Sequence, residues 1–227
     1  SIAFGIPINF DAVHVEGISN LSQKDISYAE ELGYKIKLLG IAKSQNADVE
    51  IRVHPTLVPK NRLVANVDGA MNAVLVHGNM VGPTLYYGAG AGAEPTASAV
   101  VADVIDIARQ TKLSQNTLIP SLGFMPDKIN EKNILSIENI FSEYYLRFTM
   151  KNQAGLLAKI TNIFADHDIS INSMVHKEVQ ENNQNPDIFL ITSKTKEADI
   201  DIIISEIELL PENTEKVVKI RTEELNK

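Results

Sequence analysis

Two segments of this sequence offer backbone groups that could bind a ligand, and the first is rich in glycine. Gly88-Ala89-Gly90-Ala91-Gly92-Ala93 has the G-x-G-x-x-A spacing and lies between an expected strand and an expected helix. Such glycines let a ligand approach the backbone, and the amides that open the helix favour an anion. Three interpretations stay open: a dinucleotide-binding fingerprint, a turn touching a ligand held mostly elsewhere, or a purely structural turn.

A complete dinucleotide-binding unit is not expected around these glycines. After Arg109 the chain becomes polar, where the second strand of a βαβ unit should lie. No acidic residue ends such a strand about 20 residues further on, and Asp103 and Asp106 lie on the expected helix itself. Partial contact with a ligand held mostly elsewhere is therefore favoured over a full nucleotide site.

The second segment joins a strand to a helix and reads Lys151-Asn152-Gln153-Ala154-Gly155-Leu156-Leu157. Polar residues followed by glycine at a helix start present free backbone N–H groups, which bind carboxylates well. The alternative is an ordinary strand-to-helix turn in which an asparagine caps the helix. Local chemistry does not separate these two interpretations.

Side chains that could do acid–base or metal chemistry are scattered. The five histidines show no H-x-x-x-H or H-E-x-x-H spacing, so no zinc site is expected. His54 precedes a proline on an expected strand and is interpreted as structural, and Glu16 and Asp68 receive no role. Neither a G-x-S-x-G elbow nor a phosphate-binding loop occurs.

The elements that must position the glycine-rich segment predict a mixed α/β first region. A capping box at Ser22 and Asp25 opens a helix that ends at about Leu32. A second helix follows Pro95, with apolar residues spaced as one stripe. The stripe consists of Ala97, Val100, Val101, Val104, Ile105 and Ala108. Strands are expected at 11–18, 34–42, 49–55, 70–77 and 84–87.

The second region has the order β-α-β-β-α-β, which is the ferredoxin-like pattern. Its strands are expected at 144–150, 169–175, 187–193 and 216–221, with helices marked by residues 156–167 and 200–207. A polar stretch with Pro and Gly predicts a linker over 111–142. The expected domains are therefore 1–110, with a mixed sheet, and 143–222, within an α/β (α+β) chain.

Composition excludes several classes of partner. The chain has 227 residues, a net charge of −8 and a pI of about 5.2, so neither nucleic acid nor an anionic membrane is an expected partner. It has no cysteine, which removes disulfides and thiolate chemistry and fits a cytoplasmic location. No signal peptide or membrane span is expected.

Several segments together resemble the C-terminal portion of homoserine dehydrogenase, over residues 1 to about 110. These segments are Ile2-Ala3-Phe4-Gly5, Val15-Glu16-Gly17-Ile18, Leu38-Leu39-Gly40-Ile41-Ala42, Arg52-Val53-His54-Pro55-Thr56-Leu57, Ala65-Asn66-Val67-Asp68-Gly69, Asn72-Ala73-Val74, the glycine run and Pro95-Thr96-Ala97-Ser98-Ala99-Val100. The second region resembles an ACT domain, a small-molecule regulatory module. The resemblance covers essentially the whole chain.

The resemblance implies an oxidoreductase that uses NADP or NAD to interconvert L-homoserine and L-aspartate 4-semialdehyde, in threonine, methionine and isoleucine biosynthesis. It also implies a homodimer or higher homo-oligomer. The family's Rossmann domain and catalytic lysine precede the segment matching Ser1, so the chain is expected to be an inactive fragment with no catalytic residue. A removed initiator Met is the other explanation of the first residue. Gly92, with Gly90 and Ala91, matches the segment that returns to the cofactor.

The ACT resemblance implies an amino-acid effector at Asn152, Gln153, Ala154, Gly155 and Leu156, with threonine as the effector that suits the pathway. Ser173 and Val175 on a neighbouring strand are expected to close the pocket. Many ACT loops read Asp-x-Pro-Gly, whereas this loop reads Asn152-Gln153-Ala154-Gly155, so the carboxylate and the proline are missing here. The rival interpretation is a stand-alone, non-catalytic regulator that binds an amino acid.

Overall fold

The computed structural model describes residues 1–7, 9–45, 48–111, 120, 122–177 and 185–225. The described chain divides into two compact units, each made of separate stretches of sequence. Unit 1 comprises Ser1–Ile8, Asn61–Lys132 and Leu225–Lys227, and unit 2 comprises Asn9–Lys60 and Asn133–Glu224. The two units are described one after the other.

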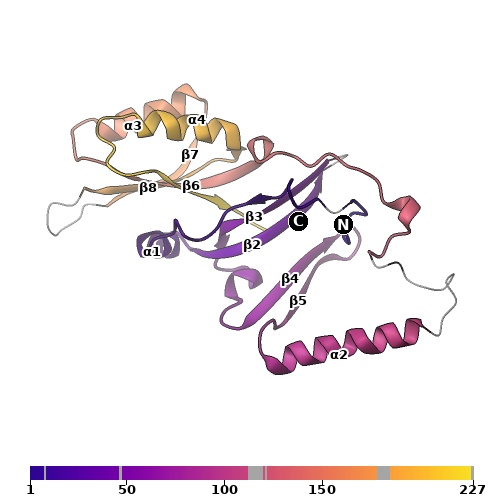
Figure 1. The fold of residues 1–227 in the computed structure, drawn as a ribbon. Coiled ribbons are helices and arrows are strands. Elements are labelled where there is room, and N and C mark those ends of the chain that lie inside the picture. The colour runs from indigo at the N-terminus through magenta and orange to yellow at the C-terminus, as the bar shows by residue number, and fades with distance from the viewer. Residues whose placement is uncertain (8, 46–47, 112–119, 121, 178–184, 226–227) are drawn as a thin grey trace. The chain divides into compact units, whose positions relative to one another are not determined.

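Unit 1 is built around a hairpin and one long helix. Strands β4 (Met71–Gly78) and β5 (Gly82–Ala89) pair antiparallel along their whole length. The helix α2 (Ala93–Gln110) follows directly after the hairpin (Figure 1). Short 3-10 turns, η1 (Leu63–Asn66) and η3 (Pro126–Lys128), complete the described elements. The hairpin and the helix therefore hold the glycine-rich segment between them.

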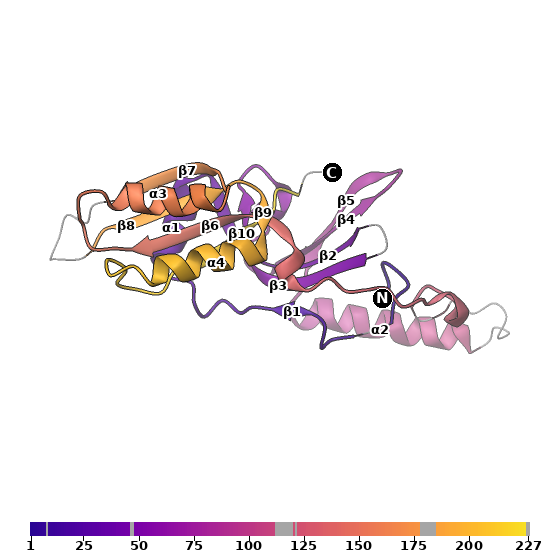
Figure 2. The ribbon, with the colours of Figure 1, turned by 90° about the horizontal axis from the view of Figure 1, so that it is seen from above.

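Unit 2 is organised by one sheet of eight strands. The main path runs β1-β3-β10-β6-β8-β7, while β2 pairs with β3 and β9 pairs with β6 (Figure 2). The strands are β1 (His14–Val15), β2 (Tyr34–Gln45), β3 (Asp48–Pro59), β6 (Phe141–Thr149), β7 (Ile171–Lys177), β8 (Asp187–Thr192), β9 (Thr195–Lys196) and β10 (Val218–Thr222). The sheet thus joins strands of the first sequence region to those of the second.

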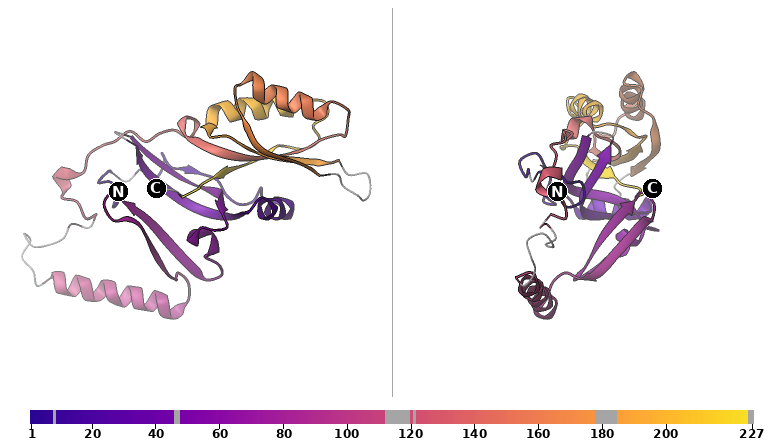
Figure 3. Two further views of the ribbon diagram at one scale, coloured as in Figure 1. Left: turned by 180° about the vertical axis from the view of Figure 1, so that it is seen from behind. Right: turned by 90° about the vertical axis from the view of Figure 1, so that its right-hand side faces the viewer.

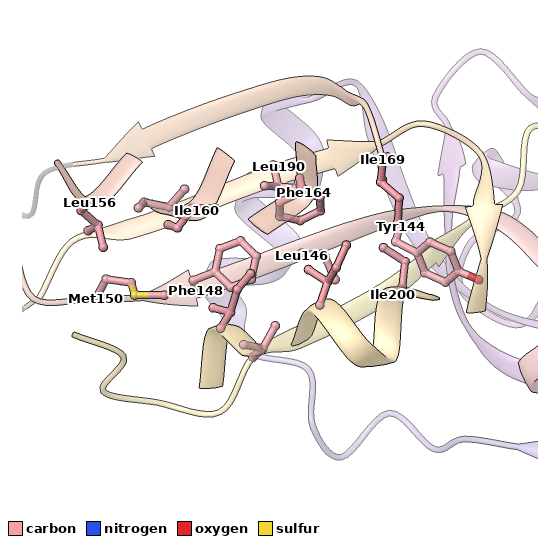
Figure 4. Close-up of a cluster of buried hydrophobic side chains, with 14 residues drawn as sticks. Tyr144, Leu146, Phe148, Met150, Leu156, Ile160, Phe164, Ile169, Leu190 and Ile200 are labelled. Atoms are coloured by element: carbon pink, nitrogen blue, oxygen red, sulfur yellow. The ribbon is translucent and has the colours of Figure 1, made fainter. Parts of the chain in front are cut away.

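Helices α3 (Leu156–Asp166) and α4 (Glu197–Glu208) cover one face of this sheet (Figure 1). They bury Ile160, Phe164 and Ile203 against every second residue of β6, including Leu146 and Phe148 (Figure 4). This alternation follows from the pleat, which sends successive side chains to opposite faces. The larger hydrophobic core of unit 2 lies here.

The opposite face of the same sheet is covered by helix α1 (Gln23–Glu31), as Figure 3 shows. A second core forms there from Ala29, Leu57, Tyr145, Phe189 and Ile220. The rings of Tyr28 and Phe189 stack with their centroids 4.4 Å apart. Neighbouring residues of β6 and β8 therefore face different cores, and both faces of the sheet are buried.

Most expected elements are confirmed. The capping box at Ser22 and Asp25 is present, and the strands expected at 34–42, 49–55, 70–77 and 84–87 and the helix after Pro95 form. The βαββαβ order is also confirmed, with the short 3-10 turn η4 (Ile137–Asn139) before it and the small strand β9 added. Part of the predicted linker, 112–119 and 121, lies outside the described residues. The domain boundary at 111–142 stays a prediction.

The strand expected at 11–18 is wrong in extent, because only His14–Val15 forms a strand. Those two residues pair with Arg52 and Val53 of β3. Further along the same edge, β10 pairs with Thr56 and Leu57. Strands β1 and β10 therefore pair with the same edge of β3, one after the other. Because β10 occupies part of this edge, only a short stretch of β3 is left to pair with β1. No described helix is long and apolar enough to cross a membrane.

Candidate functional site

The glycine-rich segment lies in unit 1, at the junction of β5 and α2. The amide of Gly90 donates a hydrogen bond of 3.1 Å to the carbonyl of Ala70, which holds the turn against the start of β4. A Cβ at Gly90 would lie 1.8 Å from Nδ2 of Asn72. Position 90 therefore needs glycine because the Asn72 side chain lies so close to it.

Gly92 ends the turn and begins the helix. It is the N-cap of α2, with φ 121° and ψ 157°, a conformation that residues with a Cβ avoid. Its carbonyl accepts hydrogen bonds from the Thr96 amide at 3.3 Å and the Thr96 hydroxyl at 2.8 Å. No side chain caps the start of this helix.

The chemistry open to this turn is limited to its backbone. Gly90, Ala91 and Gly92 are exposed, and none carries a functional side chain. Glu94 stands in the first turn of α2, and the run from Gly88 to Thr96 has no Lys or Arg. A phosphate placed there would meet a like charge, so the turn suits an uncharged part of a ligand.

Helix α2 leaves its apolar stripe uncovered. No residue of this helix is buried, and Val104 is 59% exposed. The stripe predicted from the spacing is present, but no described part of unit 1 packs over it. Apolar faces of this kind mark a surface that another polypeptide covers.

The loop Asn152 to Leu156 lies in unit 2, between β6 and α3. Asn152, Gln153 and Ala154 are exposed, while Leu156 is buried in the larger core. Gly155 is the N-cap of α3 in the left-handed conformation, with φ 84°, and no side chain caps the helix. The interpretation in which an asparagine caps this helix is therefore wrong, because glycine occupies the cap. Of the first-turn amides, that of Leu156 donates to the carbonyl of Gln153 at 3.2 Å, and none is bound by a capping side chain.

The strand expected to close this pocket is β7, which contains Ser173 and Val175. It pairs only with β8 among the described strands and so forms one edge of the sheet. Both residues are half-buried within the single chain. An edge strand offers unpaired backbone groups, which is where a second copy could supply the missing wall.

A buried ion pair that the sequence did not predict joins α1 to β6. Arg147 donates from Nε to Asp25 Oδ1 at 2.6 Å and from Nη2 to Asp25 Oδ2 at 3.3 Å. Ser22 donates from Oγ to the same carboxylate at 2.6 Å, and Tyr145 donates to it at 3.2 Å. Burial opposes ionisation, but the bonds to Arg147 and Ser22 outweigh it and lower the pKa of Asp25.

The same cluster reaches the end of β6, immediately before the loop. Thr149 donates to Asp187 Oδ1 at 2.8 Å, and Tyr28 of α1 donates to Asp187 Oδ2 at 3.1 Å. Burial, followed by the charge of Asp187, raises the pKa of Tyr28 to about 12. Hydrogen bonds therefore run from α1 to a position three residues before Asn152.

A second cluster of charged residues, around Arg221, includes the partly exposed Glu16 and lies beside the buried His54. Arg221 donates to Glu16 at 2.8 Å and to Glu197 at 2.8 Å. Burial opposes ionisation, but Arg221 and then His14 lower the pKa of Glu16 to about 2. His54 is fully buried, and burial together with Arg221 lowers its pKa to about 4. Both side chains are held by internal partners rather than presented to a substrate.

Comparison with known proteins assigns the two regions. Residues 1–105 match the family model described as homoserine dehydrogenase, and residues 144–212 match the ACT domain model. The chain is therefore similar to homoserine dehydrogenase over residues 1–105 and to ACT domains over residues 144–212. The predicted resemblance is thereby confirmed for both regions.

Relatives extend this match over the whole chain. Homoserine dehydrogenases from Pseudomonas aeruginosa and Neisseria gonorrhoeae are each 47% identical over 226 residues, covering 100% of this chain and 52% of the relative. A solved homoserine dehydrogenase from Thiobacillus denitrificans is 52% identical, with a TM-score of 0.90, covering 99% of this chain and 51% of its own. The chain spans about half the length of the relatives it matches.

The family regions and the compact units divide the chain differently. Gly90, Ala91 and Gly92 lie in the homoserine dehydrogenase region and in unit 1, whereas the loop at 152–156 lies in the ACT domain and in unit 2. Helix α1 belongs to the homoserine dehydrogenase region yet packs on the ACT sheet. The Asp25–Arg147 pair therefore links one family region to the other. No group of three described His, Asp or Glu residues could hold a metal ion.

Proposed function

We propose that this chain forms the C-terminal part of an NAD(P)-dependent homoserine dehydrogenase, which interconverts L-homoserine and L-aspartate 4-semialdehyde. One observation carries the proposal: relatives that bear this name match the chain from end to end at 47% identity. Threonine, methionine and isoleucine biosynthesis would be the pathways served. A cytoplasmic location accords with that role.

The cofactor would accept the hydride from homoserine. The glycine turn would make only some of the protein's contacts with the cofactor. Backbone groups at Gly90, Ala91 and Gly92 suit close approach, and Glu94 disfavours phosphate there. We therefore assign the turn to the nicotinamide or ribose side of the cofactor. The turn does not distinguish NADP from NAD.

Proton transfer would need a group from outside this chain. His54 is buried among its own partners, and Glu16 is partly exposed but is held by Arg221 and His14. The 227-residue chain alone is therefore expected to give no NAD(P)H from homoserine. Formation of NAD(P)H above a heat-treated control would contradict this expectation.

A chimera tests the function itself. This chain replaces the matching half of the Pseudomonas aeruginosa relative, and the chimera is assayed for homoserine oxidation with NADP and with NAD. We expect activity, and we expect Gly90→Ala to lower it because the new Cβ would meet Asn72. Gly88→Ala is the matched control, since a Cβ there has nothing within 4 Å. A folded but inactive chimera would favour the stand-alone regulator instead.

We further propose that the ACT domain binds a small amino acid, with threonine as the first candidate, at the loop of residues 152–156. The uncapped amides at the start of α3 would take the α-carboxylate, with the helix dipole adding favourable field. Calorimetry with threonine, isoleucine, methionine and lysine tests this. No heat from any of them at millimolar concentration, with the chain folded, would leave the domain without an effector.

A homodimer is proposed on the uncovered apolar surface. The hairpin of unit 1 exposes Val74, Val76, Tyr86 and Tyr87, and an isolated two-stranded hairpin is only marginally stable. In unit 2, β2 pairs only with β3 among the described strands and exposes Leu38. Sedimentation at micromolar concentration should show a dimer, and a single 25 kDa species throughout would contradict it.

A further inference from the structure

Two buried acceptor atoms close to the loop of residues 152–156 have no hydrogen-bond partner among the described residues. They are Oε2 of Glu212 and Oδ1 of Asn213. Glu212 is only 4% exposed, and acidic residues are rarely buried unless they are fully paired. A buried acceptor without a donor is costly, so two on adjacent residues call for a donor.

Backbone contacts place these residues against the start of the loop. The amide of Lys151 donates to the carbonyl of Glu212 at 2.9 Å, and Met150 forms an antiparallel bridge with Asn213. The segment that follows α4 therefore runs alongside the end of β6. Residues 212 and 213 flank the point where the chain leaves the sheet for Asn152.

A side-chain contact brings the Glu212 carboxylate to the beginning of α3. Lys159 donates from Nζ to Oε1 of Glu212 at 2.5 Å. Lys159 lies one turn into the helix that Gly155 begins. The hydrogen bond from Lys159, followed by a contact with the backbone amide of Glu212 itself, lowers the pKa of Glu212, so the carboxylate is ionised. No hydrogen bond of ordinary geometry reaches Oε2 from the described residues.

We propose that Glu212, with Asn213, binds the α-ammonium group of the amino acid whose α-carboxylate lies on the first-turn amides of α3. An ammonium group carries three donors, which is enough for both unpartnered oxygens. The site would then offer the negative charge of Glu212 to the ammonium group of a zwitterionic ligand, and the positive end of the α3 dipole to its carboxylate. This inference rests on the proposed amino-acid binding at residues 152–156.

The competing explanation is that Glu212 only clamps the segment after α4 onto α3 through Lys159. That clamp uses Oε1 and leaves Oε2 and the Asn213 oxygen unexplained. The two explanations differ in what they say about the ligand. A clamp would affect every ligand of the loop equally, whereas an ammonium-binding carboxylate discriminates ligands that have the amine from those that lack it.

The test is calorimetry on the 227-residue chain with L-threonine and with 3-hydroxybutanoate, which lacks the amine. The unmodified chain should bind threonine more tightly, because only threonine satisfies Glu212. Glu212→Gln should weaken threonine on the order of tenfold, the size expected for one charge-assisted hydrogen bond. It should leave 3-hydroxybutanoate unchanged, so that the preference between the two ligands is lost.

Two control variants separate the explanations. Lys159→Met removes the clamp but keeps the carboxylate, so the preference for threonine should remain. Glu206→Gln removes a comparable contact at the other end of α3, where Glu206 meets His167 at 2.8 Å, and should change nothing. Equal weakening of both ligands by Glu212→Gln and Lys159→Met would overturn the inference in favour of the clamp.

The outcomes also distinguish this inference from the proposal beneath it. If the unmodified chain binds threonine and Glu212→Gln binds it equally well, the role of Glu212 is wrong while amino-acid binding stands. If the unmodified, folded chain binds none of threonine, isoleucine, methionine and lysine, both are wrong. Circular dichroism of each variant establishes that the domain remains folded.

Discussion

Helices α2 and α3 start in the same way but end in different surroundings. Each follows a strand, and each begins at a glycine with positive φ, Gly92 at 121° and Gly155 at 84°, with no side-chain cap. Each carries an apolar stripe with helical spacing. Nevertheless α3 is packed into a core, and α2 buries no residue.

The difference shows that an apolar stripe predicts a contact without identifying the partner. Phe164 of α3 is 1% exposed because β6, β7, β8 and α4 lie within the same unit. Val104 of α2 has the corresponding character but is 59% exposed. The same spacing of apolar residues therefore occurs on a helix with a cover in its own unit and on a helix without one.

The largest expected effect comes from truncating the packed helix. Phe164→Ala should lower the free energy of unfolding of unit 2 by about 3–5 kcal/mol, through lost burial and a cavity in the core. Val104→Ala on α2 should change the stability of the chain by less than about 0.5 kcal/mol, because an exposed side chain loses no packing. Urea unfolding followed by circular dichroism measures both.

Equal costs for the two substitutions would break the comparison. They would mean that α2 is already covered in the isolated chain, for example by a second copy. Repeating Val104→Ala at several protein concentrations separates these cases, since coverage by a copy makes its cost concentration-dependent.

The next effect concerns α1, which covers the other face of the ACT sheet with a polar contact as well as an apolar one. Asp25→Asn should destabilise unit 2 by about 3 kcal/mol, because Arg147 stays buried without its counter-charge. Glu31→Gln is the matched control, since Glu31 pairs with Lys177 at the surface and should cost less than about 1 kcal/mol. Thermal unfolding that moves equally in both variants would remove the special role of the buried pair.

Lowering the pH should reduce the free energy of unfolding of unit 2 because of its buried histidine, His54. His54 has an ordinary pKa of 6.5, lowered to about 4 in the folded chain, so the unfolded chain binds its proton first. This contribution to stability is complete above pH 6.5 and is lost as the pH falls toward 4. The loss should reach about 2 kcal/mol between pH 7 and 5.

The measurement is urea unfolding from pH 7 to 5, where the loss from His54 already reaches about 2 kcal/mol. Below about pH 5 the unfolded chain also protonates Asp25, Glu16 and Glu197, whose pKa values are lowered in the folded chain, and their loss adds to that of His54. His54→Gln should flatten the profile. His176→Gln is the matched control because this histidine is exposed on β7. A slope that survives in His54→Gln would assign the acid sensitivity to another group.

Features set by near neighbours in the sequence were predictable, and those set by distant ones were not. The Ser22–Asp25 capping box joins residues three positions apart, and each strand has its own local pattern of apolar residues, so local spacing predicts both. Asp25 also binds Arg147, which lies 122 residues away, and no local pattern encodes that partner. The sequence therefore predicted Asp25 as a capping residue but not as the partner of Arg147.

A weaker signal for the covered sheet face was present in the sequence. Strand β8 is apolar at successive positions, and Ile188 and Phe189 face different cores. A strand that is apolar on both faces indicates that both faces are covered, but not that α1 is the cover. For the candidate sites, the spacing located the glycine turn and the ACT loop, whereas Glu212 became visible only through its contacts with Lys151 and Lys159.

The smallest expected effect distinguishes the two glycines that begin α2 and α3. Gly155 has φ 84° and ψ 0°, near the left-handed region that asparagine tolerates, and a Cβ there meets nothing within 4 Å. Gly155→Ala should therefore cost about 1 kcal/mol from the backbone alone, and Gly155→Asn should recover part of it. Gly92 has ψ 157°, outside that region, so Gly92→Asn should recover nothing relative to Gly92→Ala. Hydrogen exchange at the first turn of each helix measures the difference, with Gly88→Ala as the control because Gly88 has open space and no positive φ. Equal recovery by asparagine at both positions would show that the two helix starts share one backbone conformation, and that only the cover over α2 and α3 differs.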